Sequence, residues 1–292
     1  MFTVTCLTSP MMRTLDASRL DWLRDAWGGG ELYWLAMDEA AEFEIESEPV
    51  DLWERWAELQ DEGIDLALQP SEGRRKVLLL ADMDGTMIEQ ECIDELADIA
   101  GIGPRVAAIT ARVMNGELDF EHALVERVHL LKGMDVGIVR KVMESRITTT
   151  PGSRKLVATM RANGAYTALV SGGFTDFTRL VAGWLGFDEN RANTLLSAGG
   201  KLTGEVAQPI LGREAKVQAL DEISAMMGLE LSQCMAVGDG ANDLGMLGKA
   251  GAGVAFRAKP LVVESCRLRI NHGDLTALLY LQGYYRDEIV TV

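Results

Sequence analysis

Two aspartates separated by one residue, in the segment DMDGT at residues 82–86, directly follow a short apolar run. A carboxylate at the end of a strand can attack phosphorus as a nucleophile, and a second carboxylate beside it can exchange protons with the leaving group and then with water. We therefore predict Asp82 as the nucleophile and Asp84 as the acid and base of a two-step phosphoryl transfer. Because Asp and Gly also favour exposed turns, a solvated turn is the alternative for this segment alone.

A second acidic turn, GDGAND at residues 238–243, strengthens this interpretation. Carboxylates that converge from neighbouring strand ends repel one another unless a cation compensates their charge. Mg²⁺ prefers oxygen ligands, keeps several waters and commonly bridges carboxylates to a substrate phosphate. The sequence therefore predicts Mg²⁺ as a cofactor, with the side chains of Asp82 and Asp239 among its ligands. A calcium loop is the alternative, but the EF-hand spacing with its distal Glu is absent.

Two further segments could bind phosphate oxygens. Ser171, Gly172 and Gly173 offer a hydroxyl and unhindered backbone amides at the end of a second apolar run, and amides at a strand-to-helix junction bind phosphate well. Lys216, in the segment GREAK at residues 212–216, can supply a point charge to oxygens that a metal does not reach. Either segment alone is a weak signal, because such turns are common and most lysines are exposed.

Three apolar runs, at residues 77–84, 166–173 and 234–240, must position these side chains. Apolar strands that alternate with helical patterns indicate an α/β fold with a parallel sheet covered on both faces. Ligands of such sheets bind beyond the carboxyl ends of the strands, where each of these runs ends in a glycine-bearing turn. Between the first two runs, residues 89–150 predict a helical cap over the site, with helices at 93–100, 104–114, 120–131 and 136–145.

Composition changes near residue 76, where we predict a domain boundary. Residues 1–76 hold seven Lys or Arg against 17 Asp or Glu, and five of the six tryptophans. Trp53 and Trp56 could line an effector pocket, although burial of one helix face is the simpler interpretation. The pattern predicts a small α+β domain with strands at 2–7, 31–36 and 42–47, helices at 16–27 and 52–62, and a polar linker at 69–76 before the core at 77–292.

The composition of the whole chain excludes several classes of protein. Its 292 residues, 48% apolar and 25% charged, are typical of a folded chain of one or two domains. A net charge of −16 argues against nucleic acid and anionic membranes as partners. The N-terminus lacks a signal-peptide pattern and no apolar stretch approaches a membrane span, so we expect a soluble cytoplasmic protein. The four scattered cysteines, expected to be buried thiols, and the three histidines have no metal-site spacing.

The order of the motifs, from DxDGT through Ser-Gly-Gly and a lysine to GDGANDxxM, resembles the haloacid-dehalogenase superfamily of aspartate-nucleophile phosphatases. Within it, residues 77 to about 280 look like the phosphoserine phosphatase family. The resemblance implies a Rossmann-like core with a helical cap. It also implies Mg²⁺-dependent hydrolysis of O-phospho-L-serine through a phospho-aspartyl intermediate, the last step of serine biosynthesis. Matching stretches include ECIDE at 91–95, GELDF at 116–120, TPG at 150–152 and GKLTG at 200–204.

The same resemblance implies roles for individual residues. Asp82 would be the nucleophile, Asp84 the acid and base as well as a metal ligand through its backbone carbonyl, and Asp239 a further metal ligand. In the cap, Glu91 and Arg127 would bind the ammonium and the carboxylate of phosphoserine, which require one acid and one Arg. Spacing alone would leave both as solvated helix charges. Phosphate would be held by Ser171, Gly172, Lys216 and Asn242, with Asp243, Gly173, Met114 and Phe120 as supporting residues.

Three alternatives remain open from the sequence. A related phosphatase with a cap could act on another small phosphomonoester, such as phosphoethanolamine or phosphohomoserine. A response-regulator receiver also phosphorylates an aspartate on a parallel sheet, but it needs neither a second aspartate for the leaving group nor a cap. The N-terminal domain only loosely resembles small regulatory ACT-like domains, and it could bind a regulatory ligand or form a homodimer.

Overall fold

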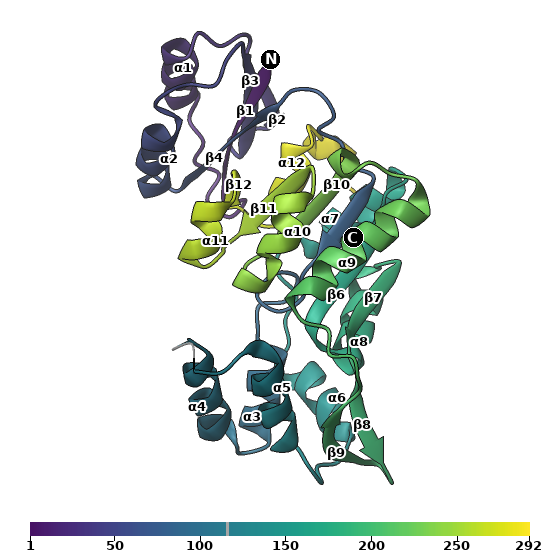
Figure 1. Ribbon diagram of the computed structural model, residues 1–292. Helices are drawn as coiled ribbons and strands as arrows, with labels where there is room; N and C mark the ends of the chain where they lie inside the picture. The colour runs from purple at the N-terminus through teal and green to yellow at the C-terminus, as the bar shows by residue number, and fades with distance from the viewer. Residues whose placement is uncertain (115–116) are drawn as a thin grey trace.

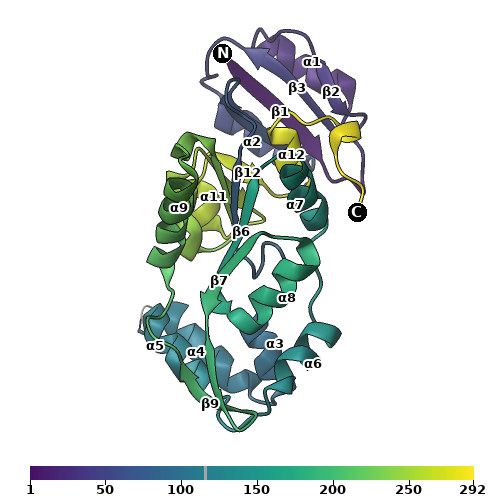
Figure 2. The ribbon, with the colours of Figure 1, turned by 90° about the vertical axis from the view of Figure 1, so that its right-hand side faces the viewer.

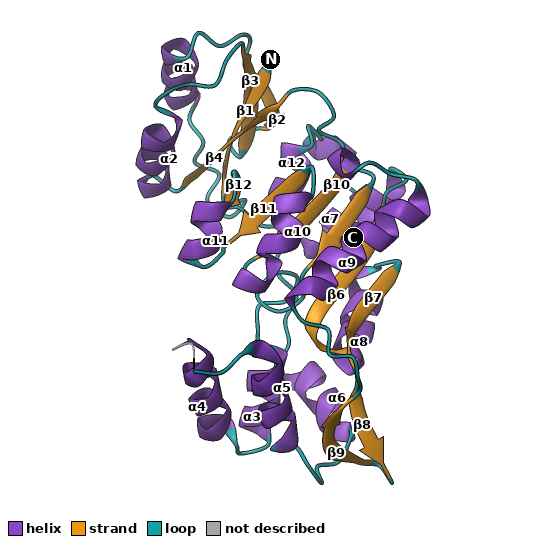
Figure 3. Cartoon of the chain, viewed as in Figure 1, coloured by secondary structure: helices purple, strands orange, loops and turns teal. Residues whose placement is uncertain are grey.

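Three parts follow one another from end to end of the molecule (Figure 1). A small antiparallel sheet with helices on one face lies at one end, a parallel sheet between helices lies in the middle, and a group of helices with a β-hairpin lies at the other end (Figure 3). The computed structural model describes residues 1–114 and 117–292, and for Met114 it describes the backbone alone. None of the helices in these ranges combines the length and the apolar composition of a transmembrane span.

The first part is an antiparallel sheet with the strand order β2-β3-β1-β4. The sequence does not predict β4, because Asp65 and Gln69 interrupt its apolar run. Both side chains are buried and hydrogen-bonded. The predicted linker accordingly begins two residues later, after Pro70. The elements of this part are β1 Phe2–Thr8, α1 Ala17–Ala26, β2 Tyr33–Ala36, β3 Ala40–Ile45, α2 Leu52–Asp61 and β4 Ile64–Pro70.

One face of this sheet packs against α1 and α2. Phe43 of the sheet and Leu59 of α2 belong to one buried apolar cluster, and Trp56 packs against it partly buried. Trp53 is 44% exposed, with the guanidinium of Arg269 at 3.9 Å from the centre of its ring. The prediction that both tryptophans lie on a buried helix face is therefore confirmed for Trp56 and wrong for Trp53, because a cation from the neighbouring sheet covers the outer ring instead.

The opposite face of the sheet packs on the C-terminal helix α12 (Ala277–Leu281). Leu7 of β1 and Leu278 of α12 share one buried cluster with the core of the central part. The carboxylate of Asp65, 1% exposed, accepts the backbone N–H groups of residues 271–273 at 2.8 to 2.9 Å. The N-terminal sheet and the central part are thus joined by apolar and buried polar contacts, while their division into two domains stays a prediction.

The central part is a six-stranded parallel sheet with the order β12-β11-β10-β5-β6-β7. Leu79 of β5 points toward the side covered by α7, α8 and α12, whereas Leu78 and Leu80 point toward α9, α10 and α11. The predicted α/β fold is confirmed, and β7, β11 and β12 extend the three predicted strands. The strands are β5 Leu78–Ala81, β6 Tyr166–Phe174, β7 Glu189–Asn193, β10 Cys234–Gly238, β11 Ala252–Phe256 and β12 Leu268–Ile270. The helices are α7 Ser153–Ala162, α8 Thr175–Leu185, α9 Arg213–Met227, α10 Leu244–Lys249 and α11 Pro260–Ser265.

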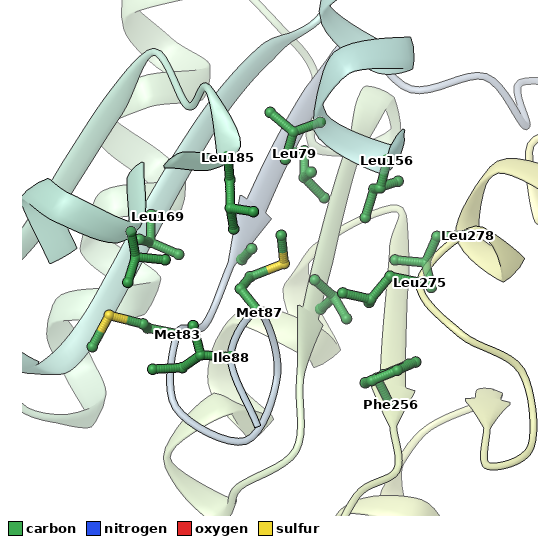
Figure 4. Packing of buried hydrophobic residues seen from close by; sticks show 14 of the residues in the cluster. Leu79, Met83, Met87, Ile88, Leu156, Leu169, Leu185, Phe256, Leu275 and Leu278 are labelled. Carbon is green, nitrogen blue, oxygen red and sulfur yellow. The ribbon is translucent and has the colours of Figure 1, made fainter. Parts of the chain in front are cut away.

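The loop after β5 is anchored in the apolar core. Met83, Met87 and Ile88 are fully buried, and Figure 4 shows them beneath Leu169 and Leu185 of the central part. The backbone N–H groups of Met87 and Ile88 donate to the carbonyl of Met83 at 2.9 and 3.0 Å, which closes a tight turn. The DMDGT segment is therefore a buried, hydrogen-bonded turn, and its interpretation as a solvated turn is wrong.

The cap consists of the four predicted helices and a hairpin that the sequence did not predict. It leaves and re-enters the core through two adjacent segments, in which the Glu89 N–H donates to the Thr148 carbonyl at 3.1 Å. The hairpin extends from the core and lies beside the cap helices (Figure 2). Each of the four cysteines is a free, buried thiol, as predicted. The elements of the cap are α3 Cys92–Ile99, α4 Gly103–Met114, α5 Phe120–His129 and α6 Gly137–Ser145, with the hairpin strands β8 Leu195–Ala198 and β9 Lys201–Val206.

Asp65→Ala should lower the free energy of unfolding by about 2–4 kcal/mol, because three backbone N–H groups lose their buried acceptor. Thermal unfolding followed by circular dichroism measures the loss. The matched control is Asp25→Ala, whose side chain is 71% exposed and pairs with Arg24 at the surface, so that it should cost less than about 0.5 kcal/mol. Equal losses in the two variants would contradict the role given to Asp65.

Candidate active site

The loops that follow β5, β6 and β10 meet the cap around a cavity of about 650 Å³. Because these three strands are parallel neighbours, their carboxyl ends share one edge of the sheet. Lys216 and Asp243 lie beneath the cavity floor, and the side chain of Met114 lies outside the described residues. The predicted residues that line the cavity are Asp82, Asp84, Glu91, Phe120, Arg127, Ser171, Gly172, Gly173, Asp239 and Asn242.

Lys216, 1% exposed, is the cation at the centre of the floor. Its ammonium lies 2.6 Å from a carboxylate oxygen of Asp82 and 2.5 Å from one of Asp243. Burial alone would lower the pKa of Lys216, but the two carboxylates outweigh it and raise that pKa above its ordinary value. The side chain is therefore a fixed positive charge that joins the turns after two strands.

Asp82 directly follows the strand β5 and is 5% exposed. Its carboxylate accepts the N–H of Met83 at 2.7 Å in addition to its contact with Lys216. Burial raises the pKa of Asp82 well above its usual range, Lys216 lowers it in part, and the nearby charges of Asp243 and Asp84 raise it again. A further cation would therefore favour the ionised carboxylate that a nucleophile needs.

Asp239 lies opposite, in the turn after β10. The hydroxyl of Thr86 donates to its carboxylate at 3.1 Å, and burial raises its pKa. A Cβ at Gly85 would lie 2.9 Å from the same carboxylate, and Gly85 has a φ of +70°, so only glycine fits this close approach without strain. The DMDGT turn is thus shaped around the carboxylate of Asp239.

The carboxylates of Asp82, Asp239 and Asp243 offer oxygens that all lie within 4.8 Å of one another. Lys216 compensates two of them, and the ammonium of Lys259, 60% exposed, is 3.9 Å from the third. The donor set is made only of carboxylate oxygens with an excess of negative charge, which fits a divalent cation such as Mg²⁺. The side chain of Asp84 is not part of this group. Its predicted contribution to metal binding, through the backbone carbonyl, stays a prediction.

The carboxylate of Asp84 faces the cap and the end of β6. One oxygen accepts the N–H of Cys92 at 3.0 Å, in the first turn of α3, and the other lies 3.5 Å from the hydroxyl of Ser171. Burial raises the pKa of Asp84, and the hydrogen bonds from Cys92 oppose this shift. A carboxyl group with a raised pKa keeps its proton to a higher pH than an exposed carboxyl group does, which suits an acid and base.

The sequence suggested that the Ser-Gly-Gly segment forms a turn after the second apolar run. In the structure this segment lies within β6 instead. The strand pairing becomes irregular between Val170 and Phe174, because the hydroxyl of Ser171 accepts the N–H of Gly173 at 2.9 Å. A Cβ at Gly172 would lie 3.0 Å from the ring of Phe120, which belongs to α5 of the cap. The cap therefore lies directly over this segment, and a Cβ at Gly172 would require the ring of Phe120 to shift.

The cap contributes the predicted acidic residue Glu91 and the predicted basic residue Arg127 to the cavity wall. Glu91 lies just before α3, and burial, together with the charges of Asp84 and Asp239, raises its pKa to about 7. Arg127 of α5 donates from Nε to the carbonyl of Ala123 at 3.2 Å and forms no ion pair within residues 1–114 and 117–292. A guanidinium facing a cavity without its own carboxylate is available to an anionic ligand.

Three charged residues of the cavity wall were not singled out from the sequence. Asp94 lies one helical turn after Glu91, a spacing that could have shown that both acids face the same side. Arg213, the first residue of α9, and Lys259 also line the cavity. Neither carries a local signal, since exposed Arg and Lys at helix ends are common.

Residues 79–248 match the model of the haloacid dehalogenase-like hydrolase family. A phosphoserine phosphatase of Streptomyces coelicolor is 43% identical over 229 residues, which are 78% of this chain and 56% of that protein. A probable phosphoserine phosphatase of Schizosaccharomyces pombe is 45% identical over 211 residues, which are 72% of this chain and 70% of that protein. The chain thus spans little more than half the length of the first relative and over two thirds of the second.

Solved structures extend this similarity to the fold. A HAD family hydrolase of Salmonella enterica serovar Typhi has a TM-score of 0.86 at 28% identity, covering 96% of this chain and 97% of its own. A phosphoserine phosphatase solved as a phospho-aspartyl intermediate analogue has a TM-score of 0.65 at 40% identity, covering 70% of this chain and 98% of its own. The first structure shares the N-terminal sheet as well as the core and cap, because it covers nearly the whole chain.

Lys216→Met should lower the free energy of unfolding at neutral pH by about 3–5 kcal/mol, because two buried carboxylates lose their counter-charge. The loss should shrink at acidic pH, since the unpaired carboxylate of Asp82, whose pKa burial raises, then binds a proton in the folded state. Denaturant unfolding at several pH values measures both effects.

Lys249→Met is the matched control for this measurement. Its ammonium forms a surface ion pair with Asp221 at 2.6 Å, so its loss should cost less than about 1 kcal/mol at every pH. If Lys216→Met is as stable as Lys249→Met, the buried ion pairs of Lys216 with Asp82 and Asp243 do not stabilise the fold.

Proposed function

The chain belongs to the haloacid dehalogenase-like hydrolases and, within them, to the phosphoserine phosphatases, and from this premise we propose that it hydrolyses O-phospho-L-serine to L-serine and phosphate. The observation that carries the proposal is one cavity in which the pair Asp82 and Asp84 shares the lining with Glu91 and Arg127 of the cap, and Arg127 forms no ion pair with the residues that the structure describes. The floor suits phosphoryl transfer, and the cap charges match the ammonium and the carboxylate of the substrate. The 650 Å³ cavity is ample for this small molecule.

In the first step, a carboxylate oxygen of Asp82 attacks phosphorus and the bond from phosphorus to the serine oxygen breaks. Asp84 gives its proton to that oxygen, so that serine leaves as a neutral alcohol and a phospho-aspartyl enzyme remains. In the second step, Asp84 takes a proton from water as the water oxygen attacks phosphorus. The bond to Asp82 breaks, which releases phosphate and restores both carboxyl groups.

The phosphate oxygens would contact groups on three sides. Lys216 supplies positive charge from beneath, while Ser171, Gly172 and Asn242 supply hydroxyl, backbone and amide contacts at the cavity floor. Such fixed donors stabilise charge on the transferring group without reorganising during the reaction. The cap covers them, with Phe120 over Gly172, and so excludes bulk water from the intermediate.

Mg²⁺ would be held by the carboxylates of Asp82 and Asp239 and the backbone carbonyl of Asp84, with Asp243 supporting them from below. This assignment rests on the group of buried carboxylates and their uncompensated charge. When bound, the ion supplies positive charge to the oxygens of the transferring phosphoryl group.

Selectivity for phosphoserine would come from the cap. Arg127 would form a charge-assisted contact with the substrate carboxylate, and Glu91 would accept hydrogen bonds from its ammonium. Phe120 would add an apolar wall. A phosphomonoester that lacks the carboxylate, such as phosphoethanolamine, would leave Arg127 unpaired.

Arg127→Met should raise the KM for phosphoserine by about 30- to 100-fold, because the carboxylate loses a charge-assisted contact. It should change kcat/KM for phosphoethanolamine by less than about threefold. Phosphate release from both esters, with Mg²⁺ present, measures these changes. Arg112→Met is the control, since Arg112 pairs with Glu126 on the outside of the cap at 2.7 Å, and Asp82→Asn should abolish turnover of both esters. If wild type prefers the ester without a carboxylate, the substrate assignment is wrong.

The dependence of kcat/KM on pH should show the titration of Glu91. Its pKa of about 7 means that it is protonated below this pH and ionised above it, so ammonium binding and kcat/KM should fall as the pH drops below about 7. The substrate phosphate titrates nearby, and Glu91→Gln separates the two effects. That variant should have a lower kcat/KM at high pH and lose the part of the pH dependence that belongs to Glu91. If wild type and Glu91→Gln show the same relative dependence of kcat/KM on pH, Glu91 does not take part in substrate binding.

A further inference from the structure

Asn193, the last residue of β7, ties together two segments that flank the proposed phosphate site. It is 2% exposed. Its amide nitrogen donates to the carbonyl of Gly172 at 2.9 Å and to that of Leu211 at 3.1 Å. Its amide oxygen accepts the N–H of Leu211 at 2.7 Å. Both donors and the acceptor of the side chain are therefore used, which fixes its orientation and excludes a flipped amide.

The Gly172 segment and the Leu211 segment position different groups that would contact phosphate. Gly172 lies in the irregular end of β6, beside the hydroxyl of Ser171. Leu211 precedes Gly212, the residue directly before α9, and so sets the position of Lys216 in the first turn of the helix. The side chain of Asn193 forms no hydrogen bond with Asp82 or Asp84. Its amide instead fixes the distance between the backbone at Gly172 and the start of α9, the helix that carries Lys216.

The same residue lies at the base of the hairpin that contacts the cap. The chain leaves β7 at Asn193, forms β8 and β9, and returns to Leu211, and the N–H of Ala207 donates to the carbonyl of Thr194 across the base at 2.9 Å. Near the tip, Leu202 exchanges backbone hydrogen bonds of 2.8 Å with residues 133 and 134 of the cap. The side-chain bonds of Asn193 therefore attach the segment that follows the returning strand β9 to the phosphate site.

We propose that Asn193 is a positioning residue for the phosphoryl group, which it serves by holding the Gly172 and Leu211 segments at a fixed separation. This inference rests on the proposed function and adds a determinant to it. A carboxylate of the same shape could not replace the amide, because it lacks the two N–H bonds to the carbonyls and would face them with negative charge. Loss of the amide should weaken contacts to phosphate more than contacts to the serine part of the ligand, which lies against the cap.

Asn193→Asp tests the proposal through the two reaction products. Inorganic phosphate and L-serine are each used as inhibitors of phosphoserine hydrolysis, and their inhibition constants are compared. In Asn193→Asp, the inhibition constant for phosphate should rise about 10- to 100-fold, as expected when buried carbonyls lose their donors. The constant for L-serine should change by less than about threefold, and kcat should fall. If Asn193→Asp fails to fold, the same two inhibition constants are measured in Asn193→Ser, which adds no charge.

Asn190→Ala is the matched control on the same strand. The amide oxygen of Asn190 accepts the hydroxyl of Thr178 at 2.9 Å, away from the phosphate site. The Asn190→Ala variant should have a lower melting temperature, while both inhibition constants stay within about threefold of wild type. Variants of Asn193 that behave like this control, or that weaken phosphate and L-serine equally, overturn the proposal. Absence of phosphoserine hydrolysis in wild type would instead contradict the proposed function, so the two failures are distinct.

Discussion

The buried ammonium of Lys216 is the contact on which the rest of the site depends. It lies 2.6 Å from a carboxylate oxygen of Asp82 and 2.5 Å from one of Asp243, which come from the turns after two neighbouring strands. Buried like charges could not lie this close without a shared counter-charge, because burial leaves each of them uncompensated. The backbone is shaped to the same contact. A Cβ at Gly238 would lie 2.4 Å from the carboxyl carbon of Asp243, so the strand must end in glycine.

One ammonium does not compensate all the carboxylates at this edge of the sheet. Burial raises the pKa of Asp84 and of Asp239, which marks both as charges that their surroundings do not fully stabilise. A bare phosphate dianion would be repelled here, whereas a divalent cation would bind and then attract phosphate. The cap completes this arrangement, because the N–H of Cys92 in its first helix holds Asp84 while the ring of Phe120 covers Gly172. The helices that exclude water therefore also orient the acid and base.

The sequence predicts best what short segments determine on their own. Apolar runs that end in glycine-bearing turns indicated β5, β6 and β10, and parallel pairing then brought their carboxylates to one edge. The strand β4 was missed because Asp65 and Gln69 are buried by partners some 200 residues away in the chain, beyond the reach of any local pattern. The three bonds of Asn193 likewise depend on tertiary contacts. Assigning Glu91 and Arg127 to the substrate needed the family resemblance, since their spacing alone indicates exposed helix charges.

The N-terminal sheet lies at the end of the molecule far from the cap, yet its contacts lead toward the cap connection (Figure 1). Asp65 holds the backbone of residues 271–273, and the N–H of Leu275 then donates to the carbonyl of Pro151 at 3.0 Å. Pro151 directly follows Thr150, whose N–H bonds to Met87 where the cap chain re-enters the core. A series of hydrogen bonds, which begins at the side chain of Asp65, therefore joins this sheet to the segment from which the cap extends. Composition marks residues 1–76 as distinct, but their apolar packing and hydrogen bonds join them to the core from which the cap extends.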